Sequence, residues 1–423
     1  MDFSNVAQRR KMVLLGGLYI TQFLGLGFII TAVPAIMREN GASLDEIGVI
    51  YVLGLVWAIK FLWAPLVDRY GSKKHGHYRS WLIVLQSLII ISLVGAAFFD
   101  IGTQLNTLAV FFAFISIFSA TQDIAADALG VTILKPEERG IGNSIQMGGG
   151  FIGNLIGGGI VLIAYEWIGW TASLLILAAA TSIPLLNIWR HKEKPAPADV
   201  RDEKVGYRDM IRFFRRPRIG SWVAVLLTYS LGISIVYALL NPMLVDIGWS
   251  LDQIGLATNI VGSLVSILGA AVAGLVVQRI GRKLAMLIAN VMVGLSIFVL
   301  FPTAQGVNNG ALIYGSICLM LFAYGANSTI LATMMMDKSN PETAGTDYTL
   351  QYSLFSIFSF VFSGGALALA EVINYSGVLW ISIGITAVSL ILVWLYKDFE
   401  PVAFAGIAYE LPLGDDAPIA TGD

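Results

Sequence analysis

The chain has little charge, three histidines and a single cysteine. Charged side chains make up 13% of its 423 residues and hydrophobic ones 57%, whereas an ordinary soluble domain is roughly a quarter charged. A lone cysteine, Cys318, excludes a disulfide within the chain and a cysteine metal site. No GxxxxGK[ST] phosphate loop is present. We therefore expect no enzyme activity, no cofactor and no bound metal, and a surface that faces mostly lipid.

What the chain does have is long apolar runs. A run of about 20 residues can cross the hydrocarbon core as a helix, and twelve such runs recur. Their approximate centres are Gly25, Leu55, Ile90, Ile117, Leu155, Ala178, Ser230, Ile267, Met292, Leu321, Phe360 and Ala387. The sequence predicts an all-α membrane protein with twelve transmembrane helices in two six-helix bundles.

Basic residues predict the orientation. Of the 26 Lys and Arg residues, 24 fall on one side if the N-terminus is cytoplasmic, while Arg38 falls outside and Lys60 within a span. Lys and Arg prefer cytoplasmic loops. We expect both termini in the cytoplasm.

The two halves repeat one plan. SLDEIG at 43–48 recurs as SLDQIG at 250–255, and Pro34 recurs as Pro242. These repeats predict an N-terminal bundle at 1–189, a cytoplasmic linker at 190–219, a C-terminal bundle at 220–396 and an acidic cytoplasmic tail at 397–423. Two parallel six-helix repeats joined by a long cytoplasmic loop resemble the major facilitator transporters, whose halves rock against each other.

The turn after the second span resembles the signature of that superfamily. A glycine there permits a tight turn, and the aspartate can accept hydrogen bonds from basic groups or from a helix N-terminus in the facing half. The alternative is ordinary turn chemistry in a solvated loop. The predicted cytoplasmic gate comprises Asp68, Arg69, Gly71 and Lys73, with Arg279 and Gly281 in the second half.

Three ionisable groups lie deep in predicted spans. Asp123 and Asp127 are one helical turn apart, and counting along the helices places them and Lys60 roughly 12 to 18 Å inside the membrane. Because charges at this depth are costly, these groups should face a cavity. Together with Gln122 they are the candidate proton-coupling or substrate residues. A purely stabilising pair between Lys60 and Asp127 is the alternative.

Further polar and aromatic side chains are predicted to line a substrate cavity, although each could equally be a helix-packing contact. They are Tyr19, Gln22, Trp57, Gln146, Tyr229, Tyr237, Tyr324, Asn327, Gln351 and Tyr352. As a set they suit an uncharged or weakly charged organic solute.

The segments KFLWAPLVDR at 60–69, HYRSW at 77–81 and QDIAAD at 122–127 resemble the AmpG-like branch of the superfamily. That branch holds muropeptide, acetyl-CoA and siderophore permeases. The compact twelve-span form and LGGLYITQ at 15–22 look more like the siderophore group. The resemblance implies a proton-coupled importer of a siderophore across the bacterial inner membrane. The alternatives are a muropeptide permease and an exporter of another organic solute. The expected partners are a small-molecule substrate, protons and the lipid bilayer, with no nucleic acid, and the expected state is a monomer.

Overall fold

The computed structural model describes residues 6–72, 74–191, 193 and 205–402. Within these ranges the chain forms helices, turns and loops, and its one β feature is an isolated bridge between Ser72 and Gly76. A helix satisfies its own backbone hydrogen bonds, which is why apolar runs of this length fold as helices in lipid. The predicted all-α fold is confirmed.

The first half begins with the long N-terminal span and ends just before the linker. Its elements are α1 (Val6–Gly27), η1 (Phe28–Ala32), α2 (Val33–Glu39), α3 (Leu44–Ile59), η2 (Lys60–Leu62), α4 (Ala64–Arg69), α5 (His77–Ala96), α6 (Leu105–Ile133), α7 (Arg139–Asn154), η3 (Leu155–Ile160) and α8 (Val161–Arg190).

A short helix in the predicted linker, α9 (Tyr207–Phe214), precedes the second half. The remaining elements are α10 (Ile219–Tyr229), α11 (Leu231–Asp246), α12 (Leu251–Ile254), η5 (Gly255–Val261), α13 (Gly262–Ile280), α14 (Arg282–Val299), α15 (Phe301–Ala304), α16 (Gly310–Asp337), η6 (Pro341–Thr343) and α17 (Ala344–Leu395).

The described residues contain nine helices long and apolar enough to cross a membrane. Two of these are double spans, because the backbone reverses at Gly169 (φ 73°) and at Asn374 (φ 62°). The segment 44–69 supplies the twelfth span through the shorter apolar helix Val52–Leu62. The count of twelve spans therefore agrees with the sequence.

The helix of the second span is interrupted at Lys60. A 3-10 turn at Lys60–Leu62 separates α3 from α4. Pro65 lies in the first turn of α4, and its ring cannot donate a hydrogen bond to the carbonyl of Phe61. Lys60 therefore sits where the helix changes direction.

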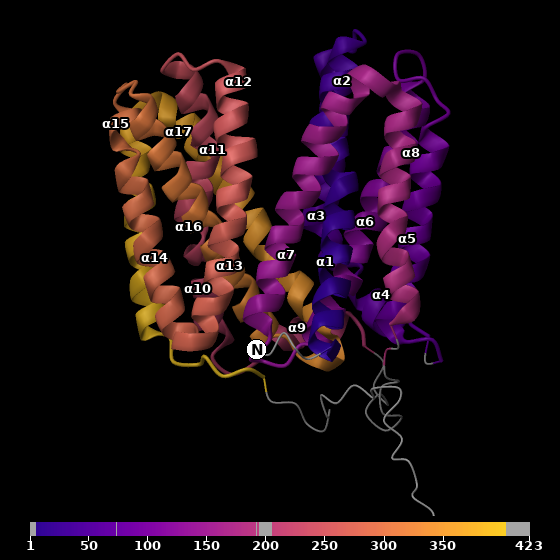
Figure 1. Cartoon of the computed structure of the whole chain (residues 1–423). Coiled ribbons are helices and arrows are strands. Elements are labelled where there is room, and N and C mark those ends of the chain that lie inside the picture. The colour runs from indigo at the N-terminus through magenta and orange to yellow at the C-terminus, as the bar shows by residue number, and fades with distance from the viewer. Residues whose placement is uncertain (1–5, 73, 192, 194–204, 403–423) are drawn as a thin grey trace, which may run out of the picture.

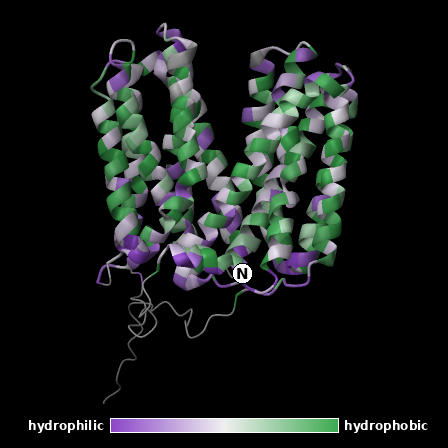
Figure 2. Cartoon of the chain, turned by 180° about the vertical axis from the view of Figure 1, so that it is seen from behind, coloured by the Kyte–Doolittle hydropathy of each residue, from purple (hydrophilic) through white to green (hydrophobic). Residues whose placement is uncertain are grey.

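The two halves approach each other at one end of the molecule and diverge toward the other (Figure 1). The start of α1, the linker helix α9 and the end of α17 all lie at the end where the halves meet, which we call the basic end. Figure 2 shows hydrophobic residues along the outer helices and hydrophilic ones mainly at the ends. Exposed Ile91, Ile183 and Leu295 belong to this apolar outer surface.

Glycines allow close contact between helices at two kinds of place. Gly153 and Gly157 press against the backbone of α1, so this part of the fifth span packs inside its own half. Gly140 and Gly274 meet across the two halves, where a Cβ on Gly140 would lie 2.9 Å from the carbonyl oxygen of Gly274. The halves therefore approach each other at the level of the backbone at the basic end.

Candidate functional site

Lys60 and Asp123 form a buried ion pair in the first half. Lys60 is fully buried, and its ammonium donates to the Asp123 carboxylate. The amide of Gln22, from α1, donates to the other oxygen of Asp123. The sequence-based alternative of a Lys60–Asp127 pair is wrong in this conformation, since Asp123 is the partner. One turn of α6 separates the two acids, and the 3-10 turn at Lys60 brings the ammonium to the deeper one.

Asp127 is held instead by neutral donors. The hydroxyl of Tyr19 and the amide of Gln146 each donate to the carboxylate at 2.8 Å. The oxygen of Gln146 in turn accepts a hydrogen bond of 3.4 Å from the hydroxyl of Tyr348, which belongs to the second half. A chain of hydrogen bonds therefore joins the buried acid to the opposite bundle.

The ammonium of Lys60 also has a contact in the second half. It lies 4.5 Å from the ring centre of Tyr352 and 5.1 Å from that of Trp57, within the range of a cation–π interaction. Tyr348 and Tyr352 are one turn apart on α17 and share a face. One helix of the second half thus contacts the surroundings of both carboxylates.

An aromatic group lies at the same central region. Tyr237 and Tyr324 stack with ring centres 5.1 Å apart, and Phe151 of the first half meets Tyr324 edge-on at 6.4 Å. Tyr237 is 50% exposed, so this group is not fully covered by other side chains. The predicted placement of Tyr237 and Tyr324 toward the centre agrees with this geometry, and Phe151 was missed.

Asn327 takes part in a second-half counterpart of the Gln22–Asp123 link. Ser230, at the break between α10 and α11, donates to the side-chain oxygen of Asn327. The nitrogen of that amide has no hydrogen-bond partner among the described residues. In both halves, therefore, the first span is joined to the fourth by a polar contact.

None of three further predicted residues shows a contact that points to a cavity. Gln351 bonds to Trp222 and to carbonyls of its own half, and the Tyr229 hydroxyl donates to the carbonyl of Met286. These are helix-packing contacts, the alternative that the sequence left open. Gln122 is fully buried, and neither atom of its amide has a hydrogen-bond partner in the described part of the chain.

Asp68 joins the halves at the basic end. Its carboxylate accepts from the backbone N–H groups of Gly345 (3.0 Å) and Thr346 (2.7 Å), and from the Thr346 hydroxyl (2.6 Å). These groups form the first turn of α17, where a helix favours negative charge. Tyr78 holds the same carboxylate from within the first half at 2.9 Å.

A cluster of ion pairs lies at the same end. Asp337, fully buried, accepts from Arg139 of the first half (2.8 Å) and from Arg282 (2.9 Å). In the second-half copy of the signature, Arg282 and Gln278 reach across to the first half, whereas Arg279 is exposed. Arg282 also donates to the carbonyl of Pro136, and Gln278 donates to the carbonyl of Glu137 at 2.6 Å.

The glycines of the two signature turns differ in role. Gly281 adopts φ 79°, as a tight turn requires. In the first half, Gly76 adopts the positive φ, of 92°, whereas Gly71 leaves room for the ring of His77. The prediction that Gly71 permits the turn is therefore wrong in its physical reason. Arg69 is exposed over the ring of Tyr70, and Lys73 lies outside the described residues.

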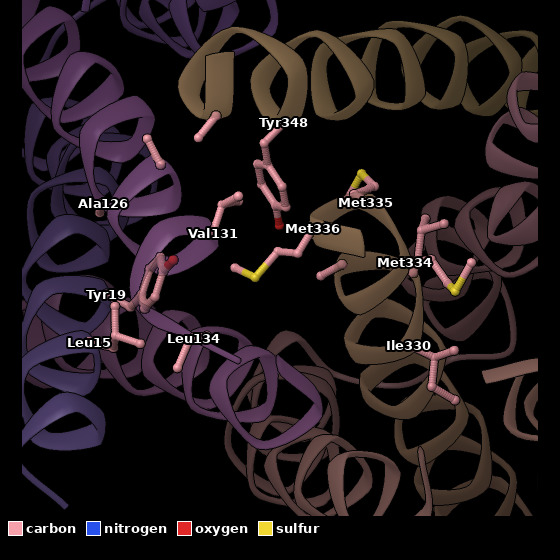
Figure 3. Close-up of a cluster of buried hydrophobic side chains, with 14 of the residues drawn as sticks. Leu15, Tyr19, Ala126, Val131, Leu134, Ile330, Met334, Met335, Met336 and Tyr348 are labelled. Atoms are coloured by element: carbon pink, nitrogen blue, oxygen red, sulfur yellow. The ribbon is translucent and has the colours of Figure 1, made fainter. Parts of the chain in front are cut away.

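Apolar side chains fill the space between the two sets of contacts. Figure 3 shows Met336 extending from α16 toward Val131 and Tyr19, with Tyr348 directed into the same cluster from α17. Met336 is buried and its sulfur lies 3.2 Å from the amide nitrogen of Asn143. In the described chain, the hydrogen bonds found between the halves lie between this cluster and the basic end.

The sequence analysis also missed Tyr348, Asp337 and Arg139. Tyr348 lies one turn before the predicted Tyr352, a spacing that could have identified it. Asp337 and Arg139 stand at predicted span ends, where charged residues are ordinary, so no local signal separated them from solvated loop residues.

The geometry is that of a transporter with a central polar site between two bundles, and comparison with known proteins agrees. The family model of the Major Facilitator Superfamily matches residues 15–363 and 223–406. The chain belongs to the Major Facilitator Superfamily, a family of transporters and not of enzymes.

Curated relatives place the chain near one branch of that superfamily. It is 29% identical to the anhydromuropeptide permease of Escherichia coli K12 over 70% of this chain and 61% of that protein. It is 30% identical to an uncharacterized protein of Haemophilus influenzae over 66% of this chain and 67% of the relative. An AmpG-type transporter of Rickettsia felis is 24% identical over 80% and 84%. The predicted AmpG-like resemblance is confirmed, whereas special closeness to siderophore permeases is not shown. The chain spans about three fifths of the length of the E. coli permease.

Solved structures share the fold. A bacterial homologue of the iron transporter ferroportin, in an outward-facing state, has a TM-score of 0.65 at 15% identity, covering 91% of this chain and 98% of that one. The human organic anion transporter MFSD10 has a TM-score of 0.68 at 15% identity, covering 91% and 99%.

Proposed function

We propose that the protein is a proton-coupled secondary transporter that imports muropeptides across the bacterial inner membrane, with its basic end in the cytoplasm. The observation that carries the proposal is the pair of links from the second half to the buried charges. Tyr348 reaches Asp127 through Gln146, and Tyr352 covers the Lys60 ammonium. In this conformation the cytoplasmic side is closed.

The proposed coupling follows from the geometry of α17. When the halves separate at the basic end, Tyr348 leaves Gln146 and Tyr352 leaves Lys60. Asp127 then becomes accessible to cytoplasmic water, which hydrates the carboxylate and favours release of a proton bound from the other side. A carboxylate whose surroundings change in this way can bind a proton on one side and release it on the other. Lys60 keeps Asp123 charged while the ion pair lasts, so Asp127 is the proposed proton carrier in this state.

The chemistry of the site supports a solute with rings and anionic groups. Once its pair with Asp123 opens, Lys60 offers a cation to a carboxylate, and the stacked pair Tyr237–Tyr324, of which Tyr237 is 50% exposed, offers a ring face to a sugar. Muropeptides combine sugar rings, amides and carboxylates. The relatives described above favour this class over siderophore import, the first interpretation of the sequence.

Uptake of a radiolabelled anhydro-muropeptide into proteoliposomes with an imposed pH gradient tests the function. We expect uptake to depend on the gradient in the wild type and to lose that dependence in Asp127→Asn. The matched control is Asp246→Asn, which removes a carboxylate bonded to Tyr375 away from the site (2.6 Å) and should transport normally.

Substrate class is tested separately by thermal shift of the purified protein. Anhydro-muropeptides should raise the melting temperature, and iron-loaded siderophores should not. Stabilisation by a siderophore alone would contradict the proposed substrate and restore the earlier interpretation.

A further inference from the structure

Helix α9 in the linker has an exposed apolar face. Tyr207, Ile211 and Phe214 are 54%, 57% and 44% exposed. They are spaced four and three residues apart and therefore line one side of the helix. Figure 1 places α9 at the basic end of the molecule, beside the ends of the membrane-spanning helices.

A basic face runs parallel to the apolar one. Arg208, Arg212 and Arg215 repeat the same spacing one residue on, and all three are exposed. At about 100° per residue, the two faces are separated by roughly a quarter of a turn. The Arg212 guanidinium contacts Asp209 at 3.1 Å, yet its side chain is 57% exposed. The helix thus presents apolar side chains flanked by cations.

The other side of α9 fixes the helix to the second half. Phe213 is fully buried in the core. Arg216, just after the helix, donates to Asp347 at 2.5 Å and to the carbonyl of Lys338 at 3.1 Å. Because these contacts set the rotation of α9, its apolar and basic faces keep a fixed direction relative to the bundle.

Charge and position together identify the occupant of these faces. The helices beside α9 span the membrane, so its exposed side lies at the level of the lipid headgroups. Helices with an apolar face flanked by Lys or Arg bind the interface of membranes that contain anionic lipid. A docking site for another protein would not have to lie at the level of the lipid headgroups or combine an apolar face with flanking cations.

We propose that α9 docks on the cytoplasmic leaflet by inserting Tyr207, Ile211 and Phe214 between anionic lipid headgroups. Arg208, Arg212 and Arg215 pair with the lipid phosphates. Docking steadies Arg216 on Asp347, one residue after the Gly345–Thr346 turn that receives Asp68. Anionic lipid therefore favours closure of the basic end.

The direct test uses a label on the apolar face. In a Cys318→Ser background, Ile211→Cys carries an environment-sensitive fluorophore, and Lys74→Cys, on an exposed loop, carries it as the positional control. The protein is reconstituted in phosphatidylcholine vesicles, with or without an equal part of phosphatidylglycerol. We expect the label at 211, and not at 74, to report an apolar environment. Spin-labelled phosphatidylglycerol should quench it more strongly than spin-labelled phosphatidylcholine.

Charge variants test the basic face. At roughly fivefold per arginine, R208Q/R212Q/R215Q should lower the affinity for phosphatidylglycerol by on the order of 100-fold. The lysine triple R208K/R212K/R215K should largely retain it. R9Q/R10Q, which alters exposed basic residues elsewhere at this end, should change nothing. A water-like signal at position 211 in both vesicles, or equal quenching by both lipids in the wild type, would overturn the proposal.

The proposed effect of lipid docking on the gate is tested by measuring the fraction of molecules closed at the basic end. Phosphatidylglycerol should raise the fraction of molecules closed at the basic end severalfold in the wild type, and this response should be lost in R216Q. A closed fraction that is the same in both vesicles would contradict the coupling between α9 and α17.

Discussion

Asp68→Asn tests the contact that joins the halves at the basic end. The 3% exposed carboxylate accepts three cross-half hydrogen bonds, two from backbone N–H groups and one from a hydroxyl. Asparagine has a single acceptor oxygen, so at least one donor of the first turn of α17 loses its partner, at about 1–3 kcal/mol. Loss of the charge at a helix N-terminus costs up to about 2 kcal/mol more.

The lost hydrogen bond and the lost charge stabilise only the closed state. Their removal should therefore favour opening by about 2–4 kcal/mol. At 1.4 kcal/mol per tenfold change, the open fraction should rise by roughly 30-fold to several hundred-fold. The assay is a distance distribution between spin labels at Lys135→Cys and Leu284→Cys, in the Cys318→Ser background. Both positions are exposed at the basic end, on opposite halves.

Asp100→Asn is the matched control for this experiment. Asp100 also accepts from two backbone N–H groups and a threonine hydroxyl, but all three donors lie in its own loop at the opposite end. D100N should leave the distance distribution unchanged. An unchanged distance distribution in D68N as well would show that these bonds do not hold the halves together.

Three further substitutions test the site and its support. Lys60→Gln leaves Asp123 buried without its cation and should destabilise the fold by about 3 kcal/mol; adding Asp123→Asn should restore thermal stability but not transport. Tyr348→Phe removes one hydroxyl and should weaken closure by about 1 kcal/mol, seen as a modest rise in the open fraction with the same spin labels. Gly71→Ala forces a Cβ into the ring of His77 and should lower stability by about 1–3 kcal/mol, measured as a lower melting temperature.

Much of the fold could be predicted because lipid imposes simple rules. Apolar runs of fixed length must be helices, which predicted the twelve spans, and the internal repeats predicted the two halves. Depth counting along the helices placed Lys60, Asp123 and Asp127 inside the membrane, and the structure buries all three.

The remainder depends on how the halves meet, which no local pattern encodes. In the sequence, Met336 cannot be distinguished from the other apolar residues of its span, yet it lies between the bundles. The partner choice of Lys60 follows from the turn at Pro65 and not from residue spacing. Helix α9 lies in a charge-rich stretch that was predicted only as a linker. The helix is eight residues long, which is too short for its amphipathic pattern to stand out in the sequence.

Transport currents on a solid-supported membrane test most directly whether Asp127 carries the coupled proton. Adding an anhydro-muropeptide to wild-type proteoliposomes should produce a transient current that grows with the inward proton gradient. Asp127→Asn should still bind the substrate, as judged by thermal shift, but give no proton-dependent current. An undiminished proton-dependent current in Asp127→Asn would contradict the proposed coupling.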